Sequence, residues 1–417
     1  MLAKEDIGID DELARLPLRE LGAGFDLLAG TRVLDLTTSI AGPYATMLLA
    51  DMGAEVIKIE RPGAGDDTRS WGPPFLHGES LWYLSVNRNK RSVTLDMLSE
   101  PGRRVFDDLL EKSDVVILNQ PPKTAKKLGL DAASLRARKP DIVYVSITGF
   151  GLEGARADWT CYDLIAEGYS GIMDLTGDQD SSAQKIGAPA ADMLAGQDAA
   201  FGTVAALFDR LRTGRGHVVE VSLVESMTRF LACRIVPFLG SGVPITRSGG
   251  KDSVIAIYQT FETADEPMTL ALGNDAIWSR FWRALGRPDM IDNPDYATNE
   301  GRRAHRERLV EEIQRILIEK PRSHWLQFLA SIRVPAGPIN SVDQVVRDEA
   351  LLERGLFYRL RGEHEVPQVG TGIRMDGRSN GPRLAPPRLG ADTDAVLGDI
   401  LGYRDEEISR LRDQAAI

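Results

Sequence analysis

The sequence predicts an α/β fold, with a large domain built on a Rossmann-like parallel sheet and a smaller α+β domain. Between residues 32 and 150, short apolar runs alternate with stretches of helical spacing, which is typical of a doubly wound parallel sheet. A long helix rich in Ala and Gly is predicted at 191–212, followed by a strand at 217–222. The composition changes at 240–251, where a connection rich in Gly and Ser separates the two domains.

The other strands of the large domain are five short apolar runs. They are predicted at residues 33–36, 56–59, 92–95, 115–118 and 142–147. Between the first two, a stretch with helical spacing ends at Gly53, so the chain forms a βαβ unit whose strands lie parallel. Because a ligand of such a unit lies at the carboxyl ends of the strands, we expect one where Ser39, Glu60 and Arg61 converge.

This unit differs from a nicotinamide site in its turn. The turn at 37–43 contains a single glycine, Gly42, whereas a dinucleotide turn needs several so that its backbone can approach a pyrophosphate. Glu60 stands where a ribose-binding acid would, but Arg61 follows it, and residues 87–91 add three more cations. An acid with several cations suits a nucleotide that carries further phosphates. An ordinary βαβ core with a solvated charged rim suits these residues equally well.

The chain of 417 residues is long enough for two domains. We divide it into a large Rossmann-like domain at 1–225, a linker at 226–250, a small α+β domain at 251–342, and a C-terminal segment at 343–417 that returns to the large domain. Within the small domain we predict strands at 255–261 and 268–272, joined by a hairpin turn, and a helix at 303–319. The polar lead-in is predicted to be partly helical at 11–21.

Composition argues against several classes of function. A net charge of −11 argues against nucleic acid as the main partner, because phosphate binding needs a basic surface. Without an apolar run of membrane-spanning length, a secretory signal or a disulfide framework (Cys161 and Cys233 are the cysteines), we expect a cytoplasmic protein without membrane association. The histidines lack metal-ligand spacing and no serine-nucleophile elbow is visible, so we expect neither a metal site nor a serine hydrolase.

Two carboxylates stand at predicted helix starts. Asp192 begins the long helix rich in Ala and Gly, and Asp163 precedes a shorter apolar helix. A helix N-terminus has a partial positive charge and free N–H groups, which would keep Asp192 ionised and oriented. The plainer interpretation of either residue is an N-cap.

Taken in order, several segments resemble the family III CoA-transferases, the CaiB/BaiF type that includes formyl-CoA:oxalate CoA-transferase. The matching segments are 33–36 with 41–43, 53–60, 65–69, 87–92 with Leu95 and Asp96, 146–151, 213–216 and 334–338. The resemblance covers about residues 30–410, nearly the whole chain. It implies an enzyme that moves CoA from an acyl-CoA to a carboxylic acid, with CoA as a substrate and no tightly bound cofactor.

The resemblance also implies roles for individual residues. It makes Asp192 the nucleophile that attacks the thioester, giving a mixed anhydride and then an enzyme–CoA thioester. It assigns Tyr162 and Asp163 to the catalytic centre as well. A glycine-rich loop closes over the anhydride in this family, and its counterpart here is Ser248, Gly249 and Gly250. An interdomain hinge is an equally open interpretation of that loop.

The residues implied in CoA binding are spread over four segments. They are Ser39, Ile40 and Ala41 along the pantetheine arm, Arg61, Leu95, Asp96 and Met97 around the adenine and its 3′-phosphate, and Asn119 and Lys127 near the phosphates. Arg61 can both stack on adenine and pair with a phosphate. Three positions depart from the family: Lys127 stands where an arginine is common, Thr160 where some members have a cation, and Glu167 replaces a glutamine.

The resemblance further implies a homodimer of two interlocked chains, which is an exception to the usual rule against entanglement. Two other functions would use the same fold. An α-methylacyl-CoA racemase-like isomerase uses a histidine–aspartate pair where this chain has Tyr162 and Asp163, and a phenol is a poor proton shuttle at neutral pH. A non-catalytic acyl-CoA-binding protein is disfavoured because Asp192 is present.

Overall fold

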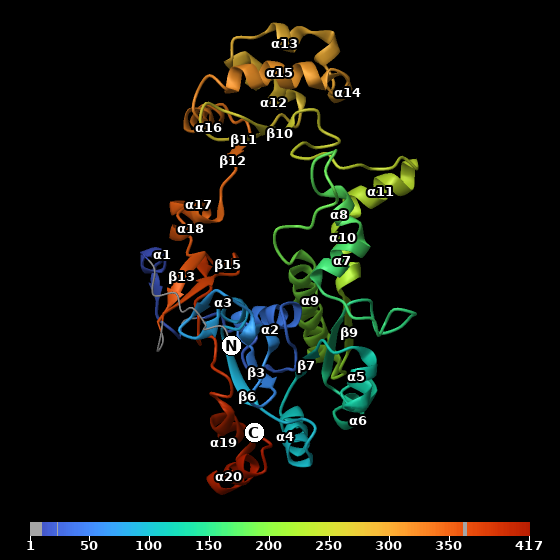
Figure 1. Ribbon diagram of the computed structural model, residues 1–417, viewed down its shortest axis with the longest axis vertical. Helices are drawn as coiled ribbons and strands as arrows, with labels where there is room; N and C mark the ends of the chain where they lie inside the picture. Colours follow the sequence, from blue (N-terminus) through green and yellow to red (C-terminus); the bar gives the residue numbers. More distant parts are fainter. Residues whose placement is uncertain (1–10, 23, 362–364) are drawn as a thin grey trace. The chain divides into compact units, whose positions relative to one another are not determined.

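Figure 1 shows the computed structural model of the chain, which describes residues 11–22, 24–361 and 365–417. Its contacts divide the chain into two compact units. The first consists of the chain up to Ile172 together with Ile186–Val236 and Asp348–Ile417, and the second of Met173–Lys185 and Pro237–Arg347. The short crossing at Met173–Lys185 has no counterpart in the sequence-based division.

The first unit is built on a six-stranded parallel sheet with the strand order β6-β3-β2-β7-β8-β9. Its strands are β2 (Arg32–Asp35), β3 (Glu55–Glu60), β6 (Lys90–Thr94), β7 (Val115–Leu118), β8 (Val143–Thr148) and β9 (Val218–Ser222). Each of the six predicted runs therefore forms a strand, and the order is that of a doubly wound nucleotide-binding sheet. The prediction of an α/β fold with a parallel sheet is confirmed.

The strands β7 and β8 are buried along their whole length, as expected of a parallel sheet with helices on both faces. All four residues of β7 are buried, at the centre of the sheet. On one face, Leu34, Ile57 and Val116 form a core with Phe106 and Leu109, two apolar residues of helix α4 (Glu100–Glu111). Helix α4 thus buries the face on which its apolar residues Val105, Phe106, Leu109 and Leu110 lie.

Helices α2 (Ala41–Asp51) and α9 (Ala190–Thr213) pack against each other at close range. A Cβ on Gly196 would lie 2.5 Å from the carbonyl oxygen of Ala41, so the two helices can approach this closely only with glycine at that position. The left-handed turn that follows α2 is supplied by Gly53, with φ of +112°.

The remaining elements of the first unit surround the sheet or extend from it. They are α1 (Asp11–Arg15), β1 (Leu18–Arg19), η1 (Asp67–Ser70), β4 (Phe75–Leu76), β5 (Glu79–Ser80), α3 (Leu81–Ser85), α5 (Pro122–Lys127), α6 (Ala132–Arg138), α7 (Asp163–Ser170), α10 (Leu223–Phe230), α18 (Glu349–Glu353), β13 (Phe357–Leu360), β14 (Val366–Val369), β15 (Arg374–Met375), β16 (Arg378–Ser379), α19 (Thr393–Leu401) and α20 (Asp405–Asp413). Strands β1, β13 and β14 form a second small sheet.

The second unit contains a three-stranded antiparallel sheet with helices packed on it. Its strands are β10 (Tyr258–Phe261), β11 (Met268–Ala271) and β12 (Ala336–Pro338), and its helices are α12 (Asp275–Ala284), α13 (Asp289–Asp292), η2 (Pro294–Tyr296), α14 (Asn299–Ala304), α15 (Arg306–Leu317), α16 (Arg322–Ser331) and α17 (Val342–Val345). The predicted hairpin pairs Phe261 with Met268. Its core is aromatic, with Trp278, Phe281 and Trp282 fully buried.

Three sequence-based expectations differ from the structure. The segment 226–250, predicted as a linker, carries most of α10 and all of α11 (Ala232–Ser241), and a further short helix, α8 (Ile172–Leu175), lies where the chain leaves the first unit. The predicted helix at 303–319 is interrupted at His305, whose ψ of 20° ends α14 before α15 begins. The lead-in is helical only over α1, because β1 follows and pairs with β13.

Candidate active site

A cavity of ≈ 190 Å³ opens at the carboxyl edge of the sheet in the first unit. It lies where the chain turns in opposite directions, since β2 is followed by β3 on one side and its neighbour β7 by β8 on the other. This topological switch point is where open parallel sheets bind ligands. The described lining residues are Thr38, Ser39, Ala41, Asp67, Asn119, Pro121, Ile147, Thr148, Gly149, Ala157, Trp159, Thr160, Cys161, Tyr162, Asp192 and Leu223.

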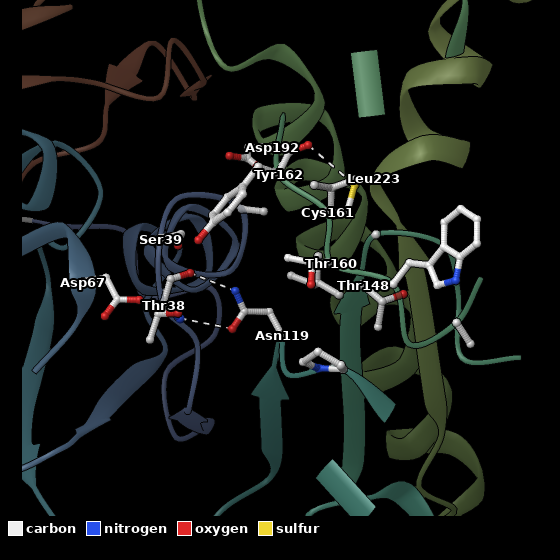
Figure 2. Close-up of a pocket in the computed structure, with 16 residues that line it drawn as sticks. Thr38, Ser39, Asp67, Asn119, Thr148, Thr160, Cys161, Tyr162, Asp192 and Leu223 are labelled. Carbon is white, nitrogen blue, oxygen red and sulfur yellow. Dashed lines mark hydrogen bonds between the residues drawn. The ribbon is translucent and has the colours of Figure 1, made fainter. Parts of the chain in front are cut away.

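Figure 2 shows that the cavity has two chemically different ends. Asp192, Tyr162 and Cys161 gather at one end, near the start of α9. Thr38 and Asn119 lie at the other, beside the turn that follows β2. Among the described lining residues none is basic, although Asp67 and Asp192 are acidic. Charge in this cavity is therefore carried by carboxylates.

The turn that follows β2 is held by side chains of neighbouring segments. Asn119, just after β7, accepts a hydrogen bond from the N–H of Thr38 at 3.1 Å and donates one to its carbonyl oxygen at 2.8 Å. The N–H of Ser39 donates to Asp66 at 3.1 Å. The N–H of Thr37 donates to Asp35 at 2.9 Å. Because these three N–H groups already have acceptors, the turn cannot receive a pyrophosphate as a dinucleotide-binding turn does.

Asp192 lies in the first turn of α9, but it is not the cap of that helix. The N–H groups of Ala191 and Asp192 both approach the carboxylate of Asp163, at 2.8 and 3.3 Å. Asp163 itself begins α7, so it joins the starts of two helices. Asp163 is therefore the residue that acts as an N-cap, and it caps α9, not its own helix α7. The Asp192 carboxylate lines the cavity.

The expectation that the helix start keeps Asp192 fully ionised is wrong. Burial, together with the nearby charge of Asp163, raises the pKa of Asp192 from 3.8 to about 7. Burial is the larger cause of the raised pKa. Asp163 adds to it, because it occupies the free N–H groups of the helix start, so Asp192 gains a like charge there instead of hydrogen-bond donors. Near neutral pH such a carboxyl group is populated in both its protonated and ionised forms, which suits a group that reacts as an anion.

Cys161 and Tyr162 form the wall next to Asp192. Burial, with the charge of Asp192, raises the pKa of the Cys161 thiol to about 11, so it stays a neutral thiol at physiological pH. Cys161 packs against Gly149, and a Cβ added to Gly149 would lie 2.1 Å from the Cβ of Cys161. Tyr162 is largely exposed. We had not expected Cys161, Thr148 or Gly149 to line a site.

A family model described as CoA-transferase family III matches residues 28–393. The chain belongs to this family. It is 36% identical to the succinyl-CoA:glutarate CoA-transferase of Mus musculus over 92% of this chain and 88% of that protein. It is 37% identical to the succinate–glutarate CoA-transferase of Agrobacterium fabrum over 89% and 95% of the two chains. The chain is therefore a CoA-transferase, and the interpretations as a racemase or a binding protein are set aside.

A solved structure supports the same assignment. The CaiB/BaiF family protein from Brucella suis is 36% identical, with a TM-score of 0.80 over 91% of this chain and all of that one. The succinyl-CoA:mesaconate CoA-transferase of Haloarcula marismortui is also 36% identical, over 86% of this chain and 92% of that protein.

Most of the residues expected to bind CoA in this CoA-transferase follow the strands β2, β3, β6 and β7 at the carboxyl edge of the sheet. Ser39, Ala41 and Asn119 line the cavity. Ile40 is buried and lies outside its wall. The exposed guanidinium of Arg61 pairs with Asp67 at 3.2 Å, so it stands beside a lining residue.

The other expected CoA residues lie outside the cavity wall. Leu95 is buried in the core just after β6, and Met97 packs against that core. Asp96 accepts a hydrogen bond from the N–H of Leu98 at 3.0 Å. Lys127 is exposed at the last position of α5, a helix whose preceding residue, Pro121, lines the cavity.

Several charges that the sequence placed at a nucleotide site serve the interior of the CoA-transferase instead. The Glu60 carboxylate is buried and binds Arg69 at 2.7 Å, so it is not a ribose-binding acid. In the segment 87–91, Arg88 pairs with Asp51 at 2.6 Å, Lys90 with Asp35 at 3.1 Å, and Arg91 with Glu55 at 3.2 Å. The partners of these three cations lie 36 to 55 positions away in the sequence, and no local signal reveals them.

The loop expected to act as a lid belongs to the second unit. Gly249 adopts φ of +61°, and its N–H donates to the carbonyl oxygen of Gly177 at 3.1 Å. A Cβ on Gly249 would lie 2.5 Å from the carboxylate of Asp178. Gly250 accepts a hydrogen bond from Thr260 at 3.1 Å. The loop that starts at Ser248 is thus tied to the crossing segment Met173–Lys185 and needs glycine for that contact.

Two features of the wider chain complete the description. In the described ranges, no group of three or more His, Cys, Asp or Glu side chains is arranged to hold a metal ion. No helix in the described part of the chain combines the length and apolarity that spanning a bilayer requires. Glu167, which departs from the family, is buried and accepts a hydrogen bond from the N–H of Ile186 at 2.9 Å, where the chain re-enters the first unit.

Proposed function

We propose that this CoA-transferase exchanges CoA between an acyl-CoA and a carboxylic acid with Asp192 as its nucleophile. The observation that carries the proposal is the position of the Asp192 carboxylate: it lines the cavity at the switch point, is not used to cap its helix, and has a pKa raised to about 7 by burial and Asp163. Tyr162 and Asp163 stand beside it, the first as a wall of the cavity and the second as the cap that orients the helix start.

The proposed reaction conserves the energy of the thioester. The Asp192 carboxylate attacks the thioester carbon, the C–S bond breaks, and the CoA thiolate leaves a mixed anhydride. The thiolate then attacks the Asp192 carbonyl carbon, releasing the donor acid and leaving an enzyme–CoA thioester. The acceptor carboxylate attacks that thioester to form a second anhydride, and the thiolate attacks the acceptor's carbonyl carbon, which frees Asp192. Water must be excluded while an anhydride exists.

The CoA molecule is proposed to lie along the carboxyl edge of the sheet. Its pantetheine arm would pass the turn of Ser39, Ile40 and Ala41 toward Asp192, with Asn119 holding that turn. Its phosphates and adenine would reach toward Arg61, Lys127 and the segment Leu95, Asp96 and Met97. Arg61→Ala should therefore weaken binding of CoA about tenfold more than binding of dephospho-CoA. Equal losses of affinity for the two ligands would show that Arg61 does not contact the 3′-phosphate.

The acids are proposed to be small dicarboxylic acids. Relatives at 36–37% identity are named for succinyl-CoA with glutarate or mesaconate. Hydroxyl groups of Thr38, Ser39 and Thr148 line the cavity and can donate hydrogen bonds to a carboxylate. Mass spectrometry of the CoA thioesters formed from succinyl-CoA and a panel of mono- and dicarboxylic acids tests this. Faster transfer to monocarboxylic acids would contradict it.

The glycine loop Ser248, Gly249 and Gly250 is proposed to act as the lid over the anhydride. The family resemblance supports this role, whereas the left-handed Gly249 and the close approaches of Asp178 and Thr260 explain why the loop needs glycine. Gly249→Ala should allow CoA to bind while increasing hydrolysis of the acyl-CoA relative to transfer, because water would reach the anhydride. An unchanged ratio of hydrolysis to transfer would leave the loop a hinge.

We also propose that the enzyme is an interlocked homodimer. The outer face of α9 carries an apolar stripe of Phe201, Val204, Phe208 and Leu211, with Phe201 77% and Leu211 87% exposed. Such a stripe on a 24-residue helix favours burial against a partner, and a second copy of the chain is the occupant. Sedimentation at nanomolar concentration tests the interlocking, since reversible appearance of folded monomer would rule it out.

The nucleophile is tested by trapping. When acyl-CoA is supplied without an acceptor, hydroxylamine or borohydride should modify Asp192, and peptide mass spectrometry should locate the adduct there. The modification should disappear in Asp192→Ala and persist in Asp178→Ala, a change of an acid in the second unit. An adduct on another carboxylate would overturn the assignment.

A further inference from the structure

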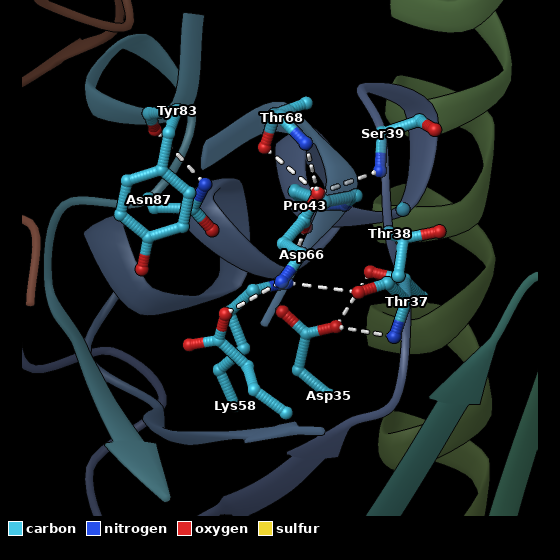
Figure 3. A network of polar contacts seen from close by, with 12 residues as sticks. Asp35, Thr37, Thr38, Ser39, Pro43, Lys58, Asp66, Thr68, Tyr83 and Asn87 are labelled. Atoms are coloured by element: carbon cyan, nitrogen blue, oxygen red, sulfur yellow. Dashed lines mark hydrogen bonds and ion pairs between the residues drawn. The ribbon is translucent and has the colours of Figure 1, made fainter. Parts of the chain in front are cut away.

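The turn at Thr37–Ser39 is held in an unusual way, because almost all of its backbone polar groups bind side chains. Asp35, Asn119 and Asp66 accept the three N–H groups of Thr37, Thr38 and Ser39. The carbonyl oxygen of Thr37 accepts from Lys58 at 2.8 Å, and that of Thr38 accepts from Asn119. Figure 3 shows Asp35, Lys58 and Asp66 beneath the turn, and Figure 2 shows the two contacts between Asn119 and Thr38.

Ser39 needs such support because of its conformation. Its φ is +68°, in the left-handed region that costs energy for a residue with a Cβ. The only side chain that accepts its N–H among the described residues is Asp66, in the segment that follows β3. Asp66 in turn forms an ion pair with Lys58 at 2.8 Å, and both side chains are fully buried.

Asp66 also holds the segment on which it lies. It accepts hydrogen bonds from the N–H and the hydroxyl of Thr68 at 2.9 and 2.8 Å. The next residue, Asp67, lines the cavity and pairs with Arg61. One carboxylate therefore joins the turn after β2 to the turn after β3, which are the two segments proposed to hold the pantetheine arm and the 3′-phosphate.

We propose that the buried Lys58–Asp66 pair is the positioning element of the CoA site, fixing the Ser39 turn relative to the segment of Arg61 and Asp67. Neither side chain lines the cavity, so they act through the backbone they hold. The inference rests on the proposed placement of CoA. Lys58 sets the carbonyl of Thr37, and Asp66 sets the N–H of Ser39, so loss of the pair releases the turn without removing any group that contacts CoA.

Stability and positioning can be separated by replacing the pair as a whole. Removing one partner leaves the other buried and unpaired, which endangers folding. Lys58→Met with Asp66→Leu removes both charges and also the acceptor for Ser39. Lys58→Met with Asp66→Asn removes both charges but keeps an amide oxygen where Ser39 donates. The two double variants thus differ in whether the N–H of Ser39, and with it the N–H and hydroxyl of Thr68, has an acceptor at residue 66.

Steady-state kinetics with both double variants test the proposal. The Met/Leu variant should raise KM for acyl-CoA about tenfold, with kcat and KM for the acid within about threefold, whereas the Met/Asn variant should stay within about threefold in all three constants. The control is Asp51→Asn, which weakens the buried ion pair with Arg88 elsewhere in the same unit. This variant should lose a similar amount of thermal stability but leave KM for acyl-CoA unchanged.

Two outcomes would overturn the proposal, and a third concerns the site itself. If the Met/Leu variant folds and keeps a normal KM for acyl-CoA, or if both double variants raise it equally, the pair does not act through the Ser39 N–H. If Ser39→Asn, which tolerates the left-handed conformation and adds bulk in the cavity, leaves KM for acyl-CoA unchanged, the placement of CoA is wrong instead. The trapping experiment at Asp192 is independent of all three outcomes.

Discussion

Carboxylates lie in two places at the carboxyl edge of the parallel sheet, fully buried in one and half-buried in the other, and the two groups have different surroundings. Beneath the turns after β2 and β3, three acids are interleaved with three cations: Asp35, Asp66 and Glu60 with Lys58, Lys90 and Arg69. At the start of α9, Asp192 has Asp163 beside it, and no cation lines the cavity among the described residues.

Burial opposes ionisation in both places, so the partners decide the direction of each pKa. Burial alone would raise the pKa of Asp66, yet Lys58 holds it below its ordinary value. Burial would likewise raise the pKa of Glu60, but its hydrogen bond to Arg69 and the charge of Lys58 lower it. At Asp192, burial and Asp163 act together and raise the pKa to about 7. The first group is permanent scaffold, and the second keeps a carboxyl group able to gain and lose a proton.

Removing Asp192, the acid that has no cation beside it, should lower the rate of CoA transfer. For Asp192→Ala we expect transfer to fall by about three to five orders of magnitude, because no other group can form the anhydride, while CoA binding changes less than about threefold. Initial rates and calorimetric titration with CoA measure the two quantities. Normal turnover by this variant would mean that the mechanism does not pass through Asp192.

Removing a cation-paired acid should instead cost stability. Asp35→Ala leaves Lys90 without its ion-pair partner and also removes the acceptor for Thr37 and Thr46. We expect the free energy of unfolding to fall by about 3–5 kcal/mol, as for other broken buried pairs. Denaturant titration at pH 7 measures it. A loss below about 1 kcal/mol would show that this group is not scaffold.

The sheet could be predicted from the sequence because its signals are local. Strands such as Val115–Leu118 are continuous apolar runs, and Gly53 marks the end of the first helix. Contacts between residues that are distant in the sequence could not be predicted, because they leave no local signal. The partner of Lys90 lies 55 positions away, and the acid that caps α9 is Asp163, which precedes Asp192 by 29 positions. Only the tertiary fold brings such pairs together.

The candidate site was predictable where a motif carried it and not elsewhere. Asp192, Ser39 and Asn119 were found from helix context and family resemblance, and the structure places them around one cavity. Cys161 lines the same cavity, yet nothing in its local sequence marks it, and Thr148 lies in the matching segment 146–151 without any sign that its side chain lines a site. Side chains that form a wall are selected by shape and neighbours, which are tertiary properties and leave no period or spacing in the chain.

The charge of Asp163 should be visible in the pH dependence. Asp163→Asn keeps an oxygen to accept the N–H groups of Ala191 and Asp192 but removes the like charge. The acidic limb of kcat/KM, which reports the free enzyme, should move from near pH 7 to lower pH by about one unit. It should stay above the ordinary carboxyl range, because burial is the larger cause. An unmoved limb would assign the whole shift to burial.

The smallest expected effect is a gain in stability at the catalytic residue. The pKa of Asp192 is about 7 in the folded chain, against an ordinary 3.8. Ionisation of Asp192 therefore lowers the free energy of unfolding as pH rises from about 4 to 7, and this loss is complete above pH 7. Asp192→Asn cannot ionise and should therefore raise the free energy of unfolding by about 1–2 kcal/mol at pH 8, with almost no change at pH 4. Asp66→Asn is the opposite case: because the pKa of Asp66 is depressed below 3.8, its loss should destabilise the protein at pH 8 and at pH 4 alike, and this effect should shrink only below about pH 4. Denaturant titrations of both variants across this range measure the sign, and a destabilised Asp192→Asn at pH 8 would mean that the Asp192 anion is stabilised by its surroundings after all.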